Sequence, residues 1–483
     1  MNLNKIFNFL FTKETKFFIG STLFLTLASS LRHFWFNSAS WDLGIFEQAI
    51  FLISQGKQPF STLLGFHILG DHGALILYPL ALLYKIFPST YFLFVLQSSS
   101  LAAAIYPLKR LSKSNKISKK NLYVSYIAFL LYPIVFNVNI FDFHPEVIAF
   151  PIVLDIFVSL KTKEIIPLWK LFLKIFFILT CKITNSFLIF GFGIWLILKG
   201  FRQLGYFIIF LSTVWFNFIA FFIIPYFGKE NATIFRQAEK FGLNDNLIFD
   251  ISTLIQIISQ VFVQIFSISN LEYLFLLIFP FIYILLNKKR LKFLFNFIPF
   301  TPLIFLNLIS NSYPMKNLVH QYSLFIVPFI AVSIQESLSP KLIEGIKNYP
   351  KWFQKRSSKF IFFWSLVTFL IFSRFTFFFG PFHNHFESAA SRREAIGMIK
   401  NNSSILTTND LVPHLSKRKN IKFTDSKIKY NLDEFDEILL DLKEPGWQSN
   451  KDFVDEIYKN LIANNRWSQK YEKDNIILFE KIK

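Results

Sequence analysis

The chain has little charge and almost no cysteine. Of its 483 residues, 17% are charged and 53% are hydrophobic. A soluble domain carries about 25% charged residues, so this deficit argues against a protein that is water-soluble throughout. Cys181 is the single cysteine, which excludes an intrachain disulfide and a cysteine-based zinc site.

The sequence also lacks the short motifs of nucleotide and hydrolase chemistry. It contains no Walker phosphate loop, dinucleotide fingerprint, GxSxG elbow or HExxH pair. The net charge of +20 lies almost wholly before residue 381, because residues 381–483 hold 17 basic and 16 acidic side chains. Lys and Arg clusters between apolar runs are typical of membrane topology, so we expect no nucleic-acid partner.

Apolar runs near the length of a membrane span recur through residue 380. A helix needs about 20 apolar residues to cross the hydrocarbon core. The sequence therefore predicts an α-helical polytopic membrane protein with about 11 transmembrane helices. The expected spans are residues 17–36, 90–108, 121–140, 147–160, 167–181, 184–198, 203–226, 271–287, 291–309, 320–336 and 358–379. The fourth to sixth are short, so they either cross at a tilt or form a hairpin that does not fully cross.

The positions of Lys and Arg predict the orientation. Basic clusters at 109–120, 288–292 and 341–359 are expected in the cytoplasm, together with the N-terminus. Alternation of the spans then places the loops 37–89 and 227–270 outside.

This alternation of loops between the two sides holds only if two further apolar segments lie on the membrane surface and do not cross it. They are residues 73–87 and 251–266, each of which has the character of an interfacial helix. We therefore divide the chain into a membrane domain, 1–380, and a small extracytoplasmic α/β domain, 381–483.

The C-terminal segment alternates between helical and strand patterns. A helix is expected after Ser388, an amphipathic helix over 451–465, and a hairpin that turns at residues 473–475. No glycine-rich phosphate loop accompanies the strands, so this segment is not expected to be catalytic.

Asp42 follows the first span and opens an expected helix, 43–55, which Gly56 ends. A carboxylate at the membrane surface could accept a proton from a sugar hydroxyl, or help to hold a divalent metal ion that neutralises a lipid phosphate. The alternative is an acid favoured by the helix dipole. Glu47 is a weaker candidate for substrate binding, because five helical positions rotate it about 140° from Asp42.

Asp71 and His72 lie between two glycines, just before the apolar segment 73–87. The backbone can bend there, so an acid, a base or a phosphate partner could face the interface. Asp71 could also simply cap a helix.

Asp142, His144 and Glu146 share one tight turn after the third span. Ionisable groups at such a place are costly unless they pair or serve a water-filled site. Pro145 and Glu146 also fit an ordinary helix start.

Lys182 lies in an outer turn between the fifth and sixth spans, where it could meet an anionic phosphate or extend to the interface. His320 and Tyr322 line another outer turn and could bind phosphate or sugar.

These motifs together resemble a prokaryotic membrane family called domain of unknown function 2079. The resemblance spans nearly the whole chain and rests on Trp41-Asp42-Leu43-Gly44-Ile45-Phe46-Glu47-Gln48, Gly70-Asp71-His72, Phe141-Asp142-Phe143-His144-Pro145-Glu146, His320-Gln321-Tyr322-Ser323 and Val412-Pro413-His414-Leu415. Where the family has Lys-Glu-Asp, this chain has Lys182-Ile183-Thr184.

That family is similar in layout to the GT-C glycosyltransferases, such as protein mannosyltransferases and aminoarabinose transferases. The resemblance implies transfer of a sugar from a polyprenyl-phosphate donor to an acceptor hydroxyl, in a bacterial plasma membrane. Asp42 would be the base, and Asp142 or Glu146 would be the second catalytic acid. Membrane lipid and the donor are the implied partners.

Two other functions stay open at this point. A transporter or flippase of a lipid-linked or anionic substrate would need ionisable groups within the membrane, for which Asp155 is the main candidate. A non-enzymatic envelope assembly protein would use the C-terminal segment as its working part.

Overall fold

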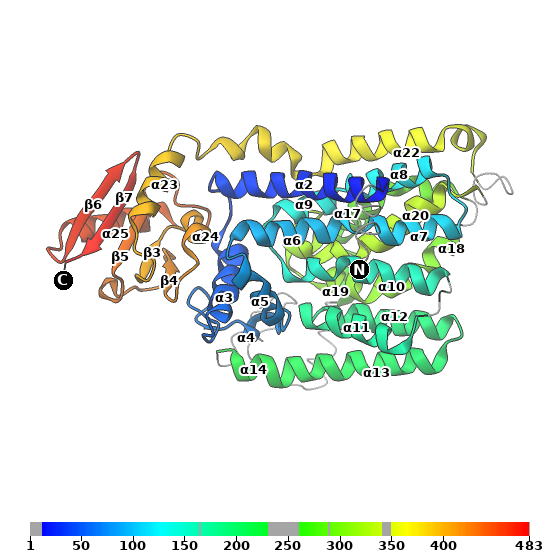
Figure 1. Cartoon of the computed structure of the whole chain (residues 1–483), viewed down its shortest axis with the longest axis horizontal. Helices are drawn as coiled ribbons and strands as arrows, with labels where there is room; N and C mark the ends of the chain where they lie inside the picture. Colours follow the sequence, from blue (N-terminus) through cyan, green and yellow to red (C-terminus); the bar gives the residue numbers. More distant parts are fainter. Residues whose placement is uncertain are drawn as a thin grey trace.

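The computed structural model describes residues 12–162, 164, 166–229, 259, 261–287, 290–340 and 349–482. Figure 1 shows the helices packed side by side, with a sheet beyond one end of them. The helices of the first half are α2 (Lys13–Phe34), α3 (Ile45–Ser54), α4 (Leu69–His72), α5 (Leu77–Ile86), α6 (Thr90–Ala102), α7 (Ile105–Ser114), α8 (Lys119–Leu130), α9 (Pro133–Ile140), α10 (Phe150–Thr162), α11 (Leu168–Cys181), α12 (Asn185–Leu198), α13 (Arg202–Phe218) and α14 (Ile224–Phe227). The second half adds α17 (Ile268–Ile278), α18 (Arg290–Phe295), α19 (Thr301–Ile309), α20 (Val327–Ser337), α22 (Lys351–Phe372), α23 (Ala389–Met398), α24 (Val412–Leu415) and α25 (Lys451–Ile462).

Several of these helices have the length and composition of membrane spans. In the described part of the chain four qualify: Thr90–Ser114, Arg202–Phe227, Ile268–Leu286 and Tyr313–Ser337. The pair α8 and α9 would add a fifth, bent by 51°. Pro133 lies at this bend, where it lacks the N–H that a continuous helix would need. The protein is thus a helical membrane protein, and the count of 11 spans stays a prediction.

The outer helices present apolar side chains to their surroundings. On the Arg202–Phe227 helix, Phe210, Phe221 and Phe222 are all exposed. Exposed aromatic surface of this extent is expected where lipid replaces water as the solvent.

The segments expected on the membrane surface differ in what the structure describes. Helix α5 has ten residues, or about 15 Å, which is half the thickness of the hydrocarbon core. This length agrees with a helix that does not cross. Most of the expected loop 227–270, including most of the segment 251–266, lies outside the described residues.

A five-stranded mixed sheet forms the C-terminal region. Its strands are β3 (Ile405–Thr407), β4 (Ile421–Phe423), β5 (Glu437–Asp441), β6 (Trp467–Lys473) and β7 (Ile476–Lys481), in the order β4-β3-β5-β7-β6. Strand β3 pairs in parallel with β4 and β5, and β7 pairs antiparallel with β5 and β6. Alternate side chains of a strand point to opposite faces of the sheet. Leu406 and Ile438 pack with α25 on one face, and Ile405 and Leu439 pack on the side of α23 on the other, so both faces are buried.

The sequence predicted this hairpin correctly. Asp474 and Asn475 join β6 to β7 and both have positive φ, which is typical of a two-residue hairpin turn. The domain boundary at residue 381 and the side of the membrane on which the sheet lies stay predictions.

The C-terminal region packs directly on the loop that follows α2. Phe36 belongs to the same buried cluster as Val412 of α24. Gly44 lies so close to α24 that an added Cβ would be 2.9 Å from Cγ1 of Val412. The Ser40 hydroxyl also donates a hydrogen bond of 2.5 Å to Oδ1 of Asn409. The backbone around Asp42 is therefore held from both ends of the chain.

Candidate active site

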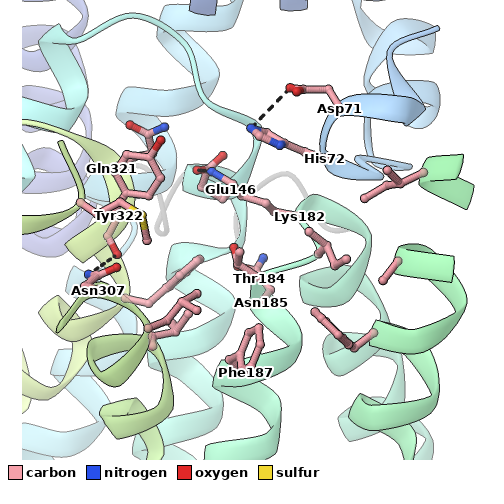
Figure 2. Close-up of a pocket in the computed structure, with 18 residues that line it drawn as sticks. Asp71, His72, Glu146, Lys182, Thr184, Asn185, Phe187, Asn307, Gln321 and Tyr322 are labelled. Carbon is pink, nitrogen blue, oxygen red and sulfur yellow. Dashed lines mark hydrogen bonds and ion pairs between the residues drawn. The ribbon is translucent and has the colours of Figure 1, made fainter. Parts of the chain in front are cut away.

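A cavity of about 290 Å³ lies among α4, α12, α13 and the loops before them. Figure 2 shows Asp71, His72, Glu146 and Gln321 toward one end, Phe187 toward the other, and Thr184, Asn185 and Asn307 between them. The polar residues are Asp71, His72, Glu146, Lys182, Thr184, Asn185, Asn307, Gln321 and Tyr322. The remaining wall is apolar and includes Phe187, Phe216, Leu303 and Phe325. The cavity thus suits an amphiphile with a polar head and an apolar chain.

A buried ion pair lies at the polar end. Nζ of Lys182 is 2.6 Å from Oε1 of Glu146, and the two side chains are 6% and 4% exposed. Nζ of Lys182 also lies 5.3 Å from the centre of the Tyr322 ring. Glu146 begins a short 3-10 helix, Pro145–Ala149, and Lys182 follows α11 in extended conformation. Both side chains line the cavity.

This pair is ionised. Burial acts to raise the pKa of Glu146, but the charges of Lys182 and His144 outweigh it and hold the pKa below its usual value. Burial acts to lower the pKa of Lys182, and the charge of Glu146 reverses the effect, so this pKa is raised. Each charge depends on the other, because both side chains are almost fully buried.

Asp42 and His144 form a second acid and base pair nearby. Nε2 of His144 is 3.2 Å from Oδ1 of Asp42, and the two side chains are 1% and 31% exposed. Against the effect of burial, His144 lowers the pKa of Asp42, and Asp42 with Glu146 raises the pKa of His144. Asp42 lies in one turn of π-helix, Ser40–Gly44, an irregularity that is frequent at functional sites.

The structure therefore joins most, but not all, of the expected site in one cavity. Asp71 and Glu146 line it, whereas Asp42 and its neighbour His144 do not. The carboxylate of Asp42 is partly exposed.

Two glycines shape the turn that carries Asp71 and His72, as the sequence predicted. Nε2 of His72 lies 3.4 Å from Oδ2 of Asp71. Gly73 ends α4 with φ of 61°, a conformation that glycine adopts without strain. At Gly70 an added Cβ would be 2.5 Å from the backbone of Gly228, so only glycine lets α4 approach α14 this closely.

Asp142 pairs with a cation, which is one of the two outcomes that the sequence left open for this turn. Its Oδ1 lies 2.5 Å from Arg32 at the end of α2, and its Oδ2 accepts a hydrogen bond from the backbone N–H of Ala39. It does not line the cavity. The side chain fastens the loop after α2 to the turn that bears His144. Between the two expected second acids, the geometry favours Glu146.

Glu47 is also part of the framework. It accepts hydrogen bonds from Tyr84, Thr90 and Ser416, each of 2.7 or 2.8 Å, and is fully buried. It does not line the cavity, so its predicted role in substrate binding gains no support from the geometry.

Of the two residues His320 and Tyr322, only one lies at the cavity. Tyr322 lines the cavity, while Nδ1 of His320 is 2.9 Å from Oδ1 of Asn317 and its ring packs on Phe141.

Sequence reasoning missed Gln321, Asn307, Thr184 and Asn185 as cavity residues. For Gln321 a signal was present, because it lies inside the motif His320-Gln321-Tyr322-Ser323.

The described residues include no group of three or more His, Cys, Asp or Glu side chains that could hold a metal ion. The divalent metal considered from the sequence thus has no ligand set in this part of the chain, and no step below depends on one.

The fold is that of a helical membrane protein with a similar solved structure. The structure is similar to the crystal structure of ArnT from Cupriavidus metallidurans bound to undecaprenyl phosphate, with a TM-score of 0.55 and 9% sequence identity. The similarity covers 96% of this chain and 97% of ArnT. At this identity it establishes the fold alone, which confirms the GT-C-like architecture expected from the sequence.

The chain belongs to the family described as predicted membrane protein (DUF2079), whose model matches residues 32–478. No curated protein matches it. The membership confirms the resemblance drawn from the sequence motifs.

Proposed function

We propose that this protein is a membrane glycosyltransferase that transfers a sugar from a polyprenyl-phosphate donor to an acceptor hydroxyl. The observation that carries the proposal is the cavity, which has ionised side chains at one end and aromatic and aliphatic side chains along the rest of its wall. A lipid-linked sugar has the same division between a polar head and an apolar chain. Further support comes from ArnT, a protein of the same fold whose structure holds undecaprenyl phosphate.

In this proposal Asp42 is the general base. Its carboxylate is partly exposed, so an acceptor can reach it, and the nearby His144 holds the pKa of Asp42 below its usual value against the effect of burial. As the acceptor oxygen attacks the anomeric carbon of the sugar, its proton moves to Asp42. The bond from that carbon to the phosphate oxygen breaks, and the electron pair stays on the phosphate.

Lys182 stabilises the departing phosphate. An ammonium has three donors, and Glu146 takes one of them. The other two remain for phosphate oxygens, in a site where burial strengthens the attraction.

The proposed setting is a bacterial plasma membrane, with the N-terminus in the cytoplasm and the cavity and sheet on the outer side. This orientation rests on the basic clusters between the apolar segments. The donor would then be a lipid-linked sugar that has already reached the outer leaflet.

Asp155, the main candidate of the transporter alternative, lies between two cations. Asp155 is paired with Arg110 at 2.6 Å and also with Lys174. A carboxylate held by two cations is better explained as a structural contact between α7, α10 and α11.

A transfer assay with the full-length protein in lipid tests the proposal. Polyprenyl phosphates that carry radiolabelled sugars are supplied as donors, and wild type is compared with Asp42→Asn. The matched control is Asp452→Asn, which removes an exposed carboxylate at the start of α25. We expect wild type and the control to move label to an acceptor or to water. The rate of transfer by Asp42→Asn should be at least about 100-fold lower, in the range of general base catalysis. Equal transfer by Asp42→Asn would exclude Asp42 as the base, and no transfer from any donor by folded wild type would contradict the proposed function.

A further inference from the structure

The side-chain amide of Gln321 faces the cavity, and the described part of the chain provides no hydrogen-bond partner for its oxygen. Gln321 lines the cavity and is only 7% exposed. Within the described residues its Oε1 is buried with no hydrogen-bond partner, and no hydrogen bond of its Nε2 is found. Leaving a buried polar group without partners costs about 1–3 kcal/mol, so an apolar side chain would be the cheaper choice for stability alone.

A second unused acceptor lies at the same end of the cavity. Oε1 of Glu146 binds Lys182, but Oε2 is buried with no hydrogen-bond partner in the part of the chain that the structure describes. Figure 2 shows Gln321 beside Tyr322 and on the same side of the cavity as Glu146. The polar end therefore offers two acceptors, Oε1 of Gln321 and Oε2 of Glu146, together with the two N–H donors of the Gln321 amide.

The three parts of a lipid-linked sugar match this set of donors and acceptors to different degrees. An isoprenoid chain has no hydrogen-bonding groups. An ionised phosphate ester only accepts, so it could use the amide N–H groups but neither acceptor. A hydroxyl both donates and accepts, so neighbouring hydroxyls can pair with the amide and with the free carboxylate oxygen together. A ligand that fills the cavity can supply the hydrogen-bond partners that the described residues do not provide for these groups.

We infer that Gln321, together with Oε2 of Glu146, binds hydroxyl groups of the sugar and makes this end of the cavity a sugar subsite. Gln321 is thus a specificity-determining residue for the donor. The inference rests on the proposed function for the identity of the lipid, but it concerns binding and not transfer.

Gln97 provides a structural comparison. It is a buried glutamine whose Nε2 donates to the carbonyl groups of Asn139 and Asp142, at 3.0 and 2.9 Å, and whose Oε1 accepts from the N–H of His144. Gln97 is held by the protein, whereas Gln321 is available to a ligand. Replacement of each by methionine, which keeps the length and removes the amide, should have opposite effects on stability.

The experiment measures binding and stability with the same purified full-length variants in lipid nanodiscs. The probes are undecaprenyl phosphate alone and undecaprenyl phosphate that carries glucose, mannose or N-acetylglucosamine. For wild type we expect at least one sugar lipid to bind more tightly than the bare lipid. Gln321→Met should weaken the binding of that sugar lipid about 10- to 100-fold. It should change the affinity for the bare lipid less than about threefold. Gln203→Met, an exposed position at the start of α13, is the control and should change neither.

The stability measurement does not depend on the choice of sugar. Gln321→Met should unfold at the same temperature as wild type or higher, and Gln97→Met at a lower one. The inference is overturned if Gln321→Met destabilises the protein as much as Gln97→Met, if no sugar lipid binds more tightly than the bare lipid, or if the preference survives in Gln321→Met.

The two proposals fail in different ways. A sugar preference that depends on Gln321, without transfer in the assay above, would support the subsite and reject the transferase. Transfer that is unaffected by Gln321→Met would do the reverse.

Discussion

Replacing Lys182 by methionine should destabilise the protein strongly, because it leaves the Glu146 carboxylate buried without its cation. The two charged atoms are 2.6 Å apart and both side chains are almost fully buried. Removal of one partner of such a pair costs about 3–5 kcal/mol in the free energy of unfolding. Removal of both charges in Lys182→Met/Glu146→Gln should cost much less than the sum of the single changes, since no uncompensated charge remains.

The assay is unfolding in increasing SDS in mixed micelles, followed by tryptophan fluorescence and analysed as a double-mutant cycle. The control is Lys443→Met, which breaks an ion pair of 3.0 Å with Glu387 in which both side chains are more than half exposed. We expect no measurable change in stability there.

The defect should also depend on pH in a defined direction. In wild type the pKa of Glu146 is held below its unfolded value of 4.5, so the stabilisation is complete above about pH 4.5 and is lost as the pH falls through the lower folded value. In Lys182→Met the carboxyl can take up a proton at low pH and become neutral. The difference between the two proteins should therefore shrink toward pH 4.5. The assignment of a buried ionised pair would be refuted if the destabilisations by the two single changes simply add in the double variant. It would also be refuted if the difference in stability between wild type and Lys182→Met grows on acidification.

Three further outcomes follow from the contacts. The pKa of His144 is raised by nearby carboxylates against the effect of burial, so its stabilisation is present below pH 6.5 and is lost as the pH rises through the higher folded value; unfolding midpoints between pH 6 and 9 should fall in wild type and stay flatter in His144→Gln. Glu47→Leu removes three buried hydrogen bonds, including that from Ser416, and should cost about 2–4 kcal/mol and speed proteolysis of the C-terminal region; unchanged cleavage would contradict this. Gly70→Ala should cost at least about 1–3 kcal/mol in thermal unfolding, because its Cβ would overlap the backbone of Gly228; a neutral effect would show that the close approach is not required.

Local features of the fold could be predicted because they depend on neighbouring residues. Apolar run lengths predicted helices near most of the described segments, and the turn at Asp474 and Asn475 followed from the residue types there. The glycines around Asp71 likewise predicted the bend that turns this side chain toward the cavity.

Partners that are distant in sequence could not be predicted. Lys182 and Glu146 are 36 residues apart, and Arg32 and Asp142 are 110 apart. A charge pattern indicates that a buried acid needs a partner, but only the packing of helices decides which cation reaches it. For this reason Asp142 looked equivalent to Glu146 in the sequence, although one fastens a loop and the other lines the cavity.

The contact between the two ends of the chain also has a consequence for biosynthesis. Glu47 and its partner Ser416 are separated by 369 residues, and the turn that carries Asp42 packs on α24. A ribosome adds about 5–20 residues per second, so this turn is made tens of seconds before its support. The newly inserted membrane part therefore lacks the contacts of the C-terminal region with this turn until translation is nearly complete, and a chain that stops early leaves the turn at Asp42 without them.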